Sequence, residues 1–405
     1  MLHENQGTRA TIRSMQPHQT FDVAVIGSGV FGAWTAHQLQ QSGAAVVLID
    51  AYGPGNSRSS SGGETRIIRI GYGPDEIYSR TAARSLQLWQ QFFERHEPST
   101  TPRHDRLFQN TGVLWLAHAD DPYCEATIRT LKLLGVRHKR FDRCELEILY
   151  PQLRFDGVEW AILELDSGAL MARRAVKAVA AAAESRGVTV CQNAVLKPAG
   201  SGRINQLSTE DGKNVIADKF IFACGPWLPK LFPELLKDLI HITRQEVFFF
   251  GTPAGDDRLN YGCVPIWVDF TDLVYAIPNL DGRGLKIAID SHGVEFDPDT
   301  GDRVVTTEGL AAVREYLRRR VPALETAPVT ESRVCQYENT SNGDFLIDRH
   351  PDFENVWLVG GGSGHGFKHG PAVAEYVVSM ISSGSTTEPR FSLSSKQKFQ
   401  RREVF

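Results

Sequence analysis

The clearest hydrophobic pattern of the chain lies near its N-terminus, where two short apolar runs frame a glycine-rich turn. Residues 21–26 (FDVAVI) and 45–49 (AVVLI) have the character of buried strands. Residues 33–39 predict a helix that follows the turn and stops near Gly43. The order of strand, turn, helix and strand predicts a βαβ unit.

The turn itself has the pattern G-x-G-x-x-G, and an acid, Asp50, follows the second strand. In such a unit Gly27 makes the tight turn, Gly29 lets a pyrophosphate approach, and Gly32 lets helix and strand pack closely. Asp50 can bind ribose hydroxyls. A G-x-G-x-x-G in full βαβ context predicts a site for an adenine dinucleotide.

A second glycine-rich turn, residues 360–366 (GGGSGHG), follows the predicted strand 356–359 and opens into a helix. A turn of this kind brings backbone N–H groups close to an anionic or polar ligand. Alone it is a weak indication. It gains weight because a turn of the same kind stands near the N-terminus.

Further pieces predict that the dinucleotide domain is discontinuous. Residues 172–186 form an alanine-rich helical stretch, and residues 217–224 form a strand that ends in a Gly-Pro turn, where Gly225 lets a ligand approach. Aromatic-rich strands around Trp267 and Tyr275 favour a mostly antiparallel second sheet. We therefore expect an α/β plus α+β fold: a dinucleotide-binding domain at 21–107, 166–237 and 342–390, a substrate domain at 108–165 and 238–341, a mobile tail at 1–20 and a C-terminal tail at 391–405.

Composition is that of a soluble enzyme. A chain of 405 residues is long for one domain, and 41% apolar residues allow a sizeable core. The net charge of −4 argues against nucleic acid or an anionic membrane surface as a main partner. No run approaches a membrane span, and residues 1–20 lack the apolar region of a signal peptide, so we expect a cytoplasmic protein.

The six cysteines show no C-x-x-C pair and no metal-like spacing, so no metal site is expected. Five of them are interpreted as ordinary thiols of a reducing compartment. Cys335 is the exception, because it stands in the chain shortly before the second glycine-rich turn.

The loop 57–69 (SRSSSGGETRIIR) combines serine, glycine and arginine, which suits phosphate contacts and close ligand approach. Arg66 and Arg69 are three residues apart and would share a face on a helical turn. A solvated basic face is the alternative interpretation.

Five motifs stand in order along the chain: residues 27–32 (GSGVFG), 63–69 (GETRIIR), 284–286 (GLK), 335–337 (CQY) and 363–368 (SGHGFK). From about residue 20 to 385 it resembles the monomeric sarcosine oxidase family of flavin amine oxidases. The resemblance implies a Rossmann-type FAD-binding domain and an antiparallel substrate domain, with the flavin ring buried between them.

The resemblance also implies roles for single residues. Cys335 matches a cysteine that bonds covalently to the flavin. Arg69 and Lys368 match the pair that holds the substrate carboxylate, and Lys286 matches a lysine that promotes reaction with dioxygen. The expected catalytic residues are Lys286, Asp290, Tyr275 and Tyr337. The expected FAD contacts are Gly27, Gly29, Val30, Phe31, Gly32, Asp50, Ser59, Thr65, Arg66, Cys335, Gly362, Gly364, Gly366, Phe367 and Lys368.

Two departures from the family pattern concern the substrate. Asp290, with His292 two residues on, stands where these enzymes carry a histidine, and Gly62 replaces a histidine before Gly63. The carboxylate favours a cationic or hydroxylated ligand, and the glycine is expected to open space near the flavin. Both point to a larger or more polar N-substituted amino acid than sarcosine. Ordinary packing remains the alternative for Tyr275 and for Tyr337.

The expected activity is oxidation of the C–N bond of a secondary-amine amino acid by FAD in a monomeric enzyme, giving an imine and, with dioxygen as acceptor, hydrogen peroxide. Three alternatives stay open. The chain could be a deglycating fructosyl-amino acid oxidase, a flavin dehydrogenase that uses another electron acceptor, or a flavin-binding protein without catalytic function.

Overall fold

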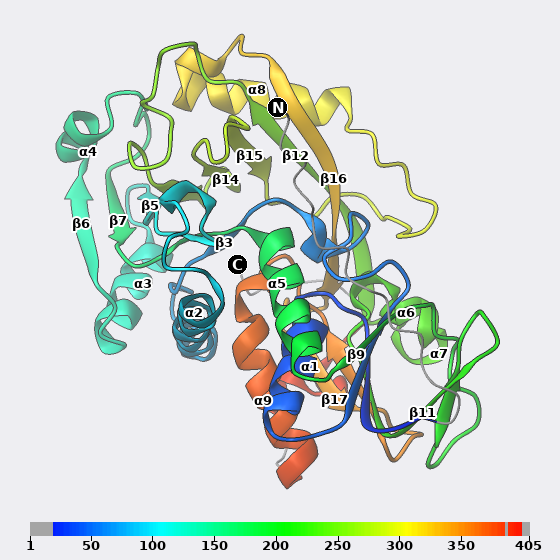
Figure 1. The fold of residues 1–405 in the computed structure, drawn as a ribbon. Helices are drawn as coiled ribbons and strands as arrows, with labels where there is room; N and C mark the ends of the chain where they lie inside the picture. The colour runs from blue at the N-terminus through cyan, green and yellow to red at the C-terminus, as the bar shows by residue number, and fades with distance from the viewer. Residues whose placement is uncertain (1–18, 385–387, 399–405) are drawn as a thin grey trace, which may run out of the picture.

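The predicted βαβ unit forms and lies in the middle of a mostly parallel sheet (Figure 1). In the computed structural model, which describes residues 19–384 and 388–398, α1 (Val30–Gln41) connects two parallel strands, β1 (Thr20–Ile26) and β2 (Val46–Asp50). The full strand order is β17 (Leu346–Arg349), β18 (Val356–Gly360), β11 (Asn214–Phe222), β1, β2 and β9 (Thr189–Gln192), with β10 (Gln206–Ser208) paired to β11.

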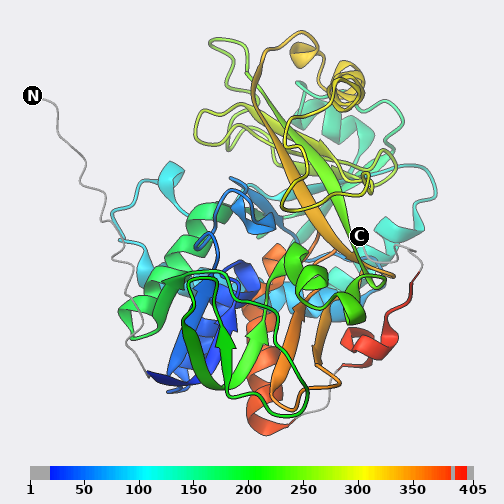
Figure 2. The same ribbon diagram turned by 90° about the vertical axis from the view of Figure 1, so that its right-hand side faces the viewer.

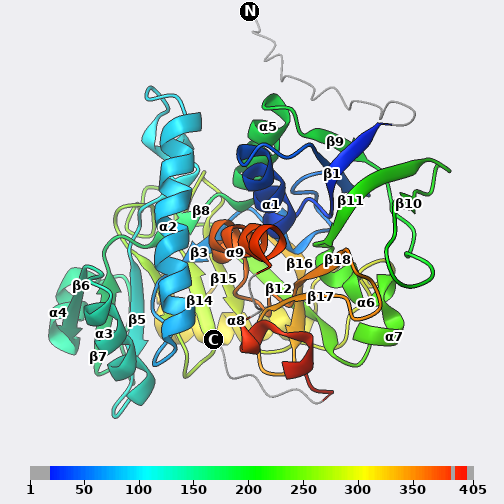
Figure 3. The ribbon, with the colours of Figure 1, turned by 90° about the horizontal axis from the view of Figure 1, so that it is seen from below.

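The strands of this sheet are apolar throughout because both faces are covered. Val25 and Leu48 belong to the core under α1, α5 (Ala172–Ser185) and α9 (Gly370–Ser383), which pack side by side in Figures 1 and 3. Ile26 and Ile49 belong to the core on the opposite face. That face is covered by the short helices α6 (Leu228–Leu231) and α7 (Pro233–Leu236).

A second sheet, antiparallel except where β13 meets β5, forms the other lobe (Figure 2). Helix α8 (Thr307–Arg320) packs Val313 and Leu317 against its outer face, together with Phe248 and Leu285. In spatial order the strands are β16 (Val329–Thr340), β12 (Ile240–Phe250), β15 (Leu285–Ile289), β14 (Val274–Ile277), β13 (Ile266–Asp269), β5 (Val113–Ala117), β7 (Trp160–Glu164) and β6 (His138–Asp142).

A small third sheet connects the two lobes. Its strands are β3 (Arg66–Ile68), β8 (Gly168–Leu170) and β4 (Phe108–Gln109). Helix α2 (Glu76–His96) contacts α9 and α3 (Pro122–Leu133), and α4 (Arg143–Leu149) packs against β6 and β7 of the second sheet. Arg66 therefore lies in a strand, so the helical turn on which Arg66 and Arg69 would share a face does not form. Ile67 and Ile68 are β-branched, which favours the extended form.

The mixed fold with a Rossmann-type domain and a mostly antiparallel second sheet is confirmed. The domain boundaries stay a prediction, although the strands of the two large sheets fall into the expected segments. Residues 1–18 of the expected N-terminal tail lie outside the described residues. The described part of the expected C-terminal tail packs onto the body, since Phe391 is buried and Leu393 N donates to Asp348. No helix in the described ranges is long and apolar enough to cross a membrane.

Candidate active site

Two cavities adjoin where the sheets meet. The first holds about 350 Å³ and lies where the carboxyl ends of β1, β2 and β11 face the middle of β16. The second holds about 90 Å³ and lies under β12, β14 and β15. Residues that line both cavities mark their junction: Arg66, Cys335, Tyr337, Gly364 and Phe367.

The glycine turn after β1 is built for close approach. Gly27 has φ +98°, and a Cβ there would lie 2.3 Å from the carbonyl oxygen of Ala223. A Cβ on Gly32 would lie 1.8 Å from the carbonyl oxygen of Gly27, so helix and turn pack as predicted. Gly29 lines the first cavity and would meet only Ser61 Oγ, at 3.4 Å.

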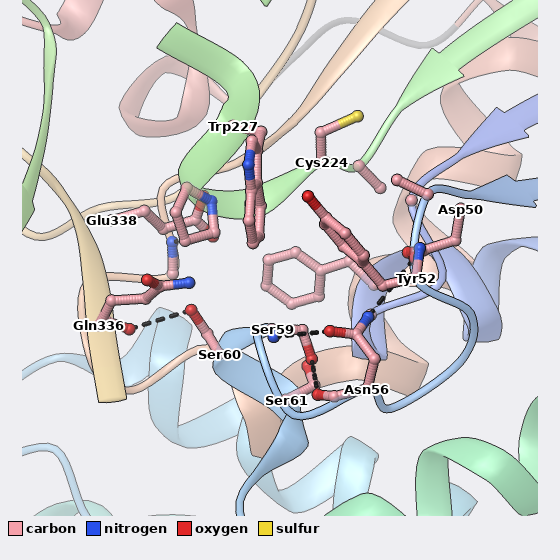
Figure 4. A pocket seen from close by; sticks show the side chains of 18 of the residues that line it. Asp50, Tyr52, Asn56, Ser59, Ser60, Ser61, Cys224, Trp227, Gln336 and Glu338 are labelled. Atoms are coloured by element: carbon pink, nitrogen blue, oxygen red, sulfur yellow. Dashed lines mark hydrogen bonds between the residues drawn. The ribbon is translucent and has the colours of Figure 1, made fainter. Parts of the chain in front are cut away.

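Asp50 closes one end of the first cavity, as Figure 4 shows. Its carboxylate accepts hydrogen bonds from Ser28 N at 2.7 Å and Tyr52 N at 2.8 Å. Desolvation raises the pKa of Asp50, although these backbone donors oppose the rise. The carboxylate is therefore fixed at the end of β2, where it can receive hydroxyl groups.

Cys335 lies at the junction of the two cavities, and its Sγ is 3.3 Å from Arg66 Nη2. Arg66 is itself held by the carbonyl oxygens of Ser60 at 2.6 Å and Thr65 at 2.8 Å. A fixed guanidinium beside sulfur favours reaction of that sulfur as a nucleophile. The geometry suits covalent attachment of a ligand that enters the first cavity.

One wall of the second cavity carries two buried cations. Arg69 is 7% exposed, donates to Gly71 O at 2.5 Å and lies over the rings of Tyr72, Trp115 and Phe270 at 4.5, 4.8 and 5.3 Å. Within the described residues no carboxylate is close enough to form an ion pair with Arg69. Lys368 is 4% exposed and donates to Tyr72 OH at 2.6 Å. The buried guanidinium group of Arg69, which has no carboxylate partner among the described residues, favours an anionic ligand in this cavity.

Strand alternation directs Lys286 and Asp290 to this cavity, because Leu285 and Ile287 belong to the core under α8. Lys286 is 3% exposed and donates to Thr65 O at 2.8 Å. Burial, and then the nearby Arg66, lower the pKa of Lys286 well below its usual value.

The lining of the second cavity also carries a tyrosine–carboxylate pair. Tyr337 OH donates to Asp290 Oδ1 at 2.7 Å. Tyr275 also lines this cavity, with Lys286 Nζ 5.7 Å from its ring centre, and burial raises the pKa of its hydroxyl. The four residues predicted as catalytic therefore lie around one cavity.

Most residues predicted to contact the cofactor line the first cavity, and three do not. Gly32 packs between helix and turn, Thr65 holds Lys286, and Lys368 lines only the second cavity. The expectation that Gly62 opens space is wrong, since a Cβ there would lie 1.9 Å from the carbonyl oxygen of Asn56. The backbone of Asn56 fills the space that a side chain at position 62 would occupy.

Sequence reasoning missed several residues of the site. Trp227 and Glu338 line the first cavity (Figure 4), and Tyr72 supports both cations of the second. Glu164 is fully buried and accepts from Ile70 N at 2.7 Å and from the next N–H along the chain at 2.9 Å, which fixes the backbone after Arg69. Of these residues, only Glu338 could have been noticed from the sequence, because it follows Tyr337 directly in a predicted strand.

A cavity at the carboxyl ends of a parallel sheet, beside a glycine-rich βα turn, defines a dinucleotide-binding protein of the Rossmann class. The sequence profile of the family of FAD dependent oxidoreductases matches residues 22–380, and the chain belongs to this family. The residues present fit FAD, because the glycine cradle admits a pyrophosphate and Asp50 is held ready for hydroxyl groups.

The resemblance to monomeric sarcosine oxidases is confirmed. The chain is 30% identical to the monomeric sarcosine oxidase of Bacillus sp. (strain B-0618), over 90% of this chain and 93% of that protein. It is 27% identical to the N-methyl-L-tryptophan oxidase of Citrobacter koseri (strain ATCC BAA-895 / CDC 4225-83 / SGSC4696), over 88% of this chain and 93% of that protein.

Solved structures share the fold at lower identity. The L-proline dehydrogenase from P. horikoshii has a TM-score of 0.78 at 24% identity, over 93% of this chain and 98% of that one. The deglycating fructosamine oxidase from Aspergillus fumigatus (Amadoriase II) has a TM-score of 0.76 at 19% identity, over 95% of this chain and 94% of that one. These structures show the fold, and membership of the family of FAD dependent oxidoreductases shows the class of enzyme.

Proposed function

We propose that the protein oxidises the C–N bond of a small secondary-amine amino acid, N-substituted or cyclic, to an imine, with dioxygen as electron acceptor and hydrogen peroxide as product. The observation that carries this proposal is the pair of buried cations, Arg69 and Lys368, in a cavity that opens onto the FAD site. The sarcosine and N-methyl-L-tryptophan oxidases among its relatives support an amine substrate.

Each wall of the second cavity has its own task in this proposal. Arg69 and Lys368 bind the substrate carboxylate, and the aromatic rings around Arg69 exclude water and strengthen the attraction. The Tyr337–Asp290 pair orients the amine side by hydrogen bonding. When bound, FAD supplies the oxidant for the C–N bond and delivers the electrons to dioxygen.

Two further residues act on the cofactor side of the proposal. Cys335 Sγ is the atom that bonds to FAD, with Arg66 favouring its reaction. Lys286, held beside the junction by Thr65, supplies positive charge where dioxygen is reduced. Both assignments agree with the family motifs in which these residues lie.

The size of the second cavity favours a compact substrate. About 90 Å³ is less than the roughly 150 Å³ of a protein cavity that accommodates benzene. Gly62 adds no room, because backbone fills its side-chain position. A fructosyl-amino acid is larger than a small N-methyl or cyclic amino acid, so the small second cavity favours the latter, although Asp290 suits a polyol.

The test is a hydrogen peroxide assay across N-methyl, cyclic and fructosyl amino acids, each compared with its carboxamide. We expect turnover of small N-methyl or cyclic amino acids, and a preference for the acid over the amide that collapses in Arg69→Lys and Lys368→Met. Equal turnover of acid and amide by the unaltered chain would contradict the clamp. Cofactor reduction without peroxide would indicate the dehydrogenase alternative.

A further inference from the structure

Glu338 places a carboxyl group with an unsatisfied oxygen in the wall of the first cavity. The residue is 8% exposed, and its Oε2 has no hydrogen-bond partner among the described residues. Its Oε1 accepts a hydrogen bond from Gly362 N at 3.2 Å. A buried polar oxygen without a partner is destabilising in the protein alone, so it marks a position where a ligand atom belongs.

Three glycines lie close to this carboxyl group, and side chains in their place would crowd it. A Cβ on Gly360 would lie 3.3 Å from Oε2 of Glu338, one on Gly362 would lie 3.3 Å from Oε1, and one on Gly225 would lie 3.7 Å from Oε2. In Figure 4 Glu338 lies beside Trp227, on the side of the pocket opposite Asp50. The carboxyl group is thus packed against glycine backbone in the lining of the first cavity.

The position of Glu338 on β16 indicates which part of a dinucleotide it faces. Gln336 and Glu338 line only the first cavity, whereas Cys335 and Tyr337 also line the second. Glu338 lies three residues from Cys335, which is about 10 Å along a strand. Since Cys335 lies at the flavin end and Asp50 at the ribose end, Glu338 faces the middle of the cofactor.

We propose that Glu338, in its protonated form, donates a hydrogen bond from Oε2 to an oxygen in the middle of bound FAD, on the ribityl chain or the pyrophosphate. Burial raises the pKa of Glu338 to about 7, so the acid form is available near neutral pH. The negative pyrophosphate opposes ionisation of a neighbouring carboxyl group. The inference rests on the FAD assignment and not on the identity of the amine.

Other charged or titratable groups stand on the elements around Glu338. They are Cys224 after β11, Asp50 at the end of β2, Lys230 in α6 and Arg244 on β12. Arg244 is paired with Glu246 at 2.8 Å and Lys230 with Asp299 at 2.6 Å. An experiment on pH dependence must therefore separate Glu338 from these groups by substitution.

The test measures the Kd for FAD by quenching of flavin fluorescence between about pH 5.5 and 9. It uses the full chain carrying Cys335→Ala, which makes the cofactor exchangeable, with Cys335→Ser as a second background should the alanine variant not fold. With Glu338 present, we expect the Kd to rise above pH 7 by up to about tenfold per pH unit. Glu338→Gln keeps a hydrogen-bond donor, so this variant should bind FAD at pH 6 as tightly as the chain that carries Glu338. Because an amide does not ionise, the Kd of the variant should not change with pH.

Two further variants complete the design. Glu338→Leu removes the donor and should weaken binding about three- to tenfold at low pH. Glu354→Gln is the control for the loss of a carboxylate, because Glu354 is exposed and lines neither cavity, and both the Kd and its pH dependence should stay unchanged. FMN and riboflavin locate the contact, since only a ribityl contact would survive in riboflavin.

The proposal is overturned if the Kd does not change with pH and Glu338→Leu binds as tightly as its parent. It is also overturned if affinity rises with pH, which would make Glu338 an ionised acceptor. A pH dependence that persists in Glu338→Gln would assign the titration to another group. None of these outcomes depends on turnover, so the result stands whether or not the amine proposal succeeds.

Discussion

The hydroxyl group of Tyr72 accepts a hydrogen bond from Lys368 Nζ at 2.6 Å. The same tyrosine lies under Arg69, whose guanidinium is 4.5 Å from the ring centre. The two cations that we assign to the substrate carboxylate are therefore held by one side chain that does not line the cavity. This arrangement makes Tyr72 a positioning residue, because it acts through Arg69 and Lys368.

The histidines behind Tyr72 fix the direction of its hydrogen bonds. His365 Nε2 lies 2.9 Å from Gly343 O and must donate to it, so Nδ1 accepts from Tyr72 OH at 3.1 Å. His369 Nε2, 2.8 Å from the same hydroxyl, is then the donor. Burial, and then the neighbouring Lys368, lower the pKa of His369 well below its usual value, which agrees with a neutral ring.

Tyr72→Phe tests this positioning role. We expect KM for the substrate to rise about tenfold or more with a smaller change in kcat, since a hydrogen bond to a charged group contributes about 1.5–3 kcal/mol. Tyr78→Phe is the matched control: Tyr78 is equally buried and 5.4 Å from the Tyr72 ring, but it bonds to Asp344. A larger KM effect in the control, or a change confined to Tm in Tyr72→Phe, would contradict the role.

Cys335 is expected to retain the cofactor covalently. On acid precipitation of the unaltered protein, the yellow colour should stay with the pellet, and in Cys335→Ala it should pass to the supernatant. Cys224→Ser is the control, because Cys224 lines the same cavity but lies apart from its junction with the second. If all of the yellow colour of the unaltered protein passed to the supernatant, Cys335 could not be the site of covalent attachment.

Local geometry explains why the dinucleotide site could be predicted from the sequence. The requirement for Gly27 and Gly32 is steric and is met within one turn, so the spacing alone carries it. The same holds for strand alternation, which correctly directs Lys286 and Asp290 to one side of β15. The family motifs then added Cys335 and the two cations of the clamp.

Contacts between distant segments explain what could not be predicted. Tyr72 and Lys368 are 296 residues apart in the sequence, and no local sequence pattern predicts the hydrogen bond between them. The space expected at Gly62 depended on what lies opposite, which is the backbone of Asn56. Glu338 stands in a predicted strand, but its importance comes from the glycines that other segments bring around it.

Lys286 should control the reaction with dioxygen in a pH-dependent way. The depressed pKa means that Lys286 loses its proton at a lower pH than an ordinary lysine, so the rate of reoxidation should fall with rising pH well before pH 10.5. Lys286→Met should slow reoxidation about 10²- to 10³-fold and leave anaerobic reduction by substrate nearly unchanged. Stopped-flow absorbance separates the two half-reactions.

Lys286→Arg is the companion variant, since it keeps a positive charge at every pH used and should lose the pH dependence. Lys230→Met is the control for a change in net charge, because Lys230 lines the first cavity and is paired with Asp297 and Asp299. Reoxidation that is equally fast in Lys286→Met and the unaltered enzyme would exclude the assigned role.

The carboxyl group of Glu338 should make the cofactor-free protein less stable as pH rises. Burial raises its folded-state pKa from 4.5 to about 7, so the unfolded chain loses this proton first and ionisation favours unfolding. The loss begins near pH 4.5 and is complete above pH 7, where it reaches about 3 kcal/mol. Urea denaturation of the flavin-free Cys335→Ala chain, with and without Glu338→Gln, measures it. The stability difference between the two should shift in favour of glutamine by about 3 kcal/mol between pH 4 and 8, and a constant difference would show that Glu338 ionises normally in the folded state.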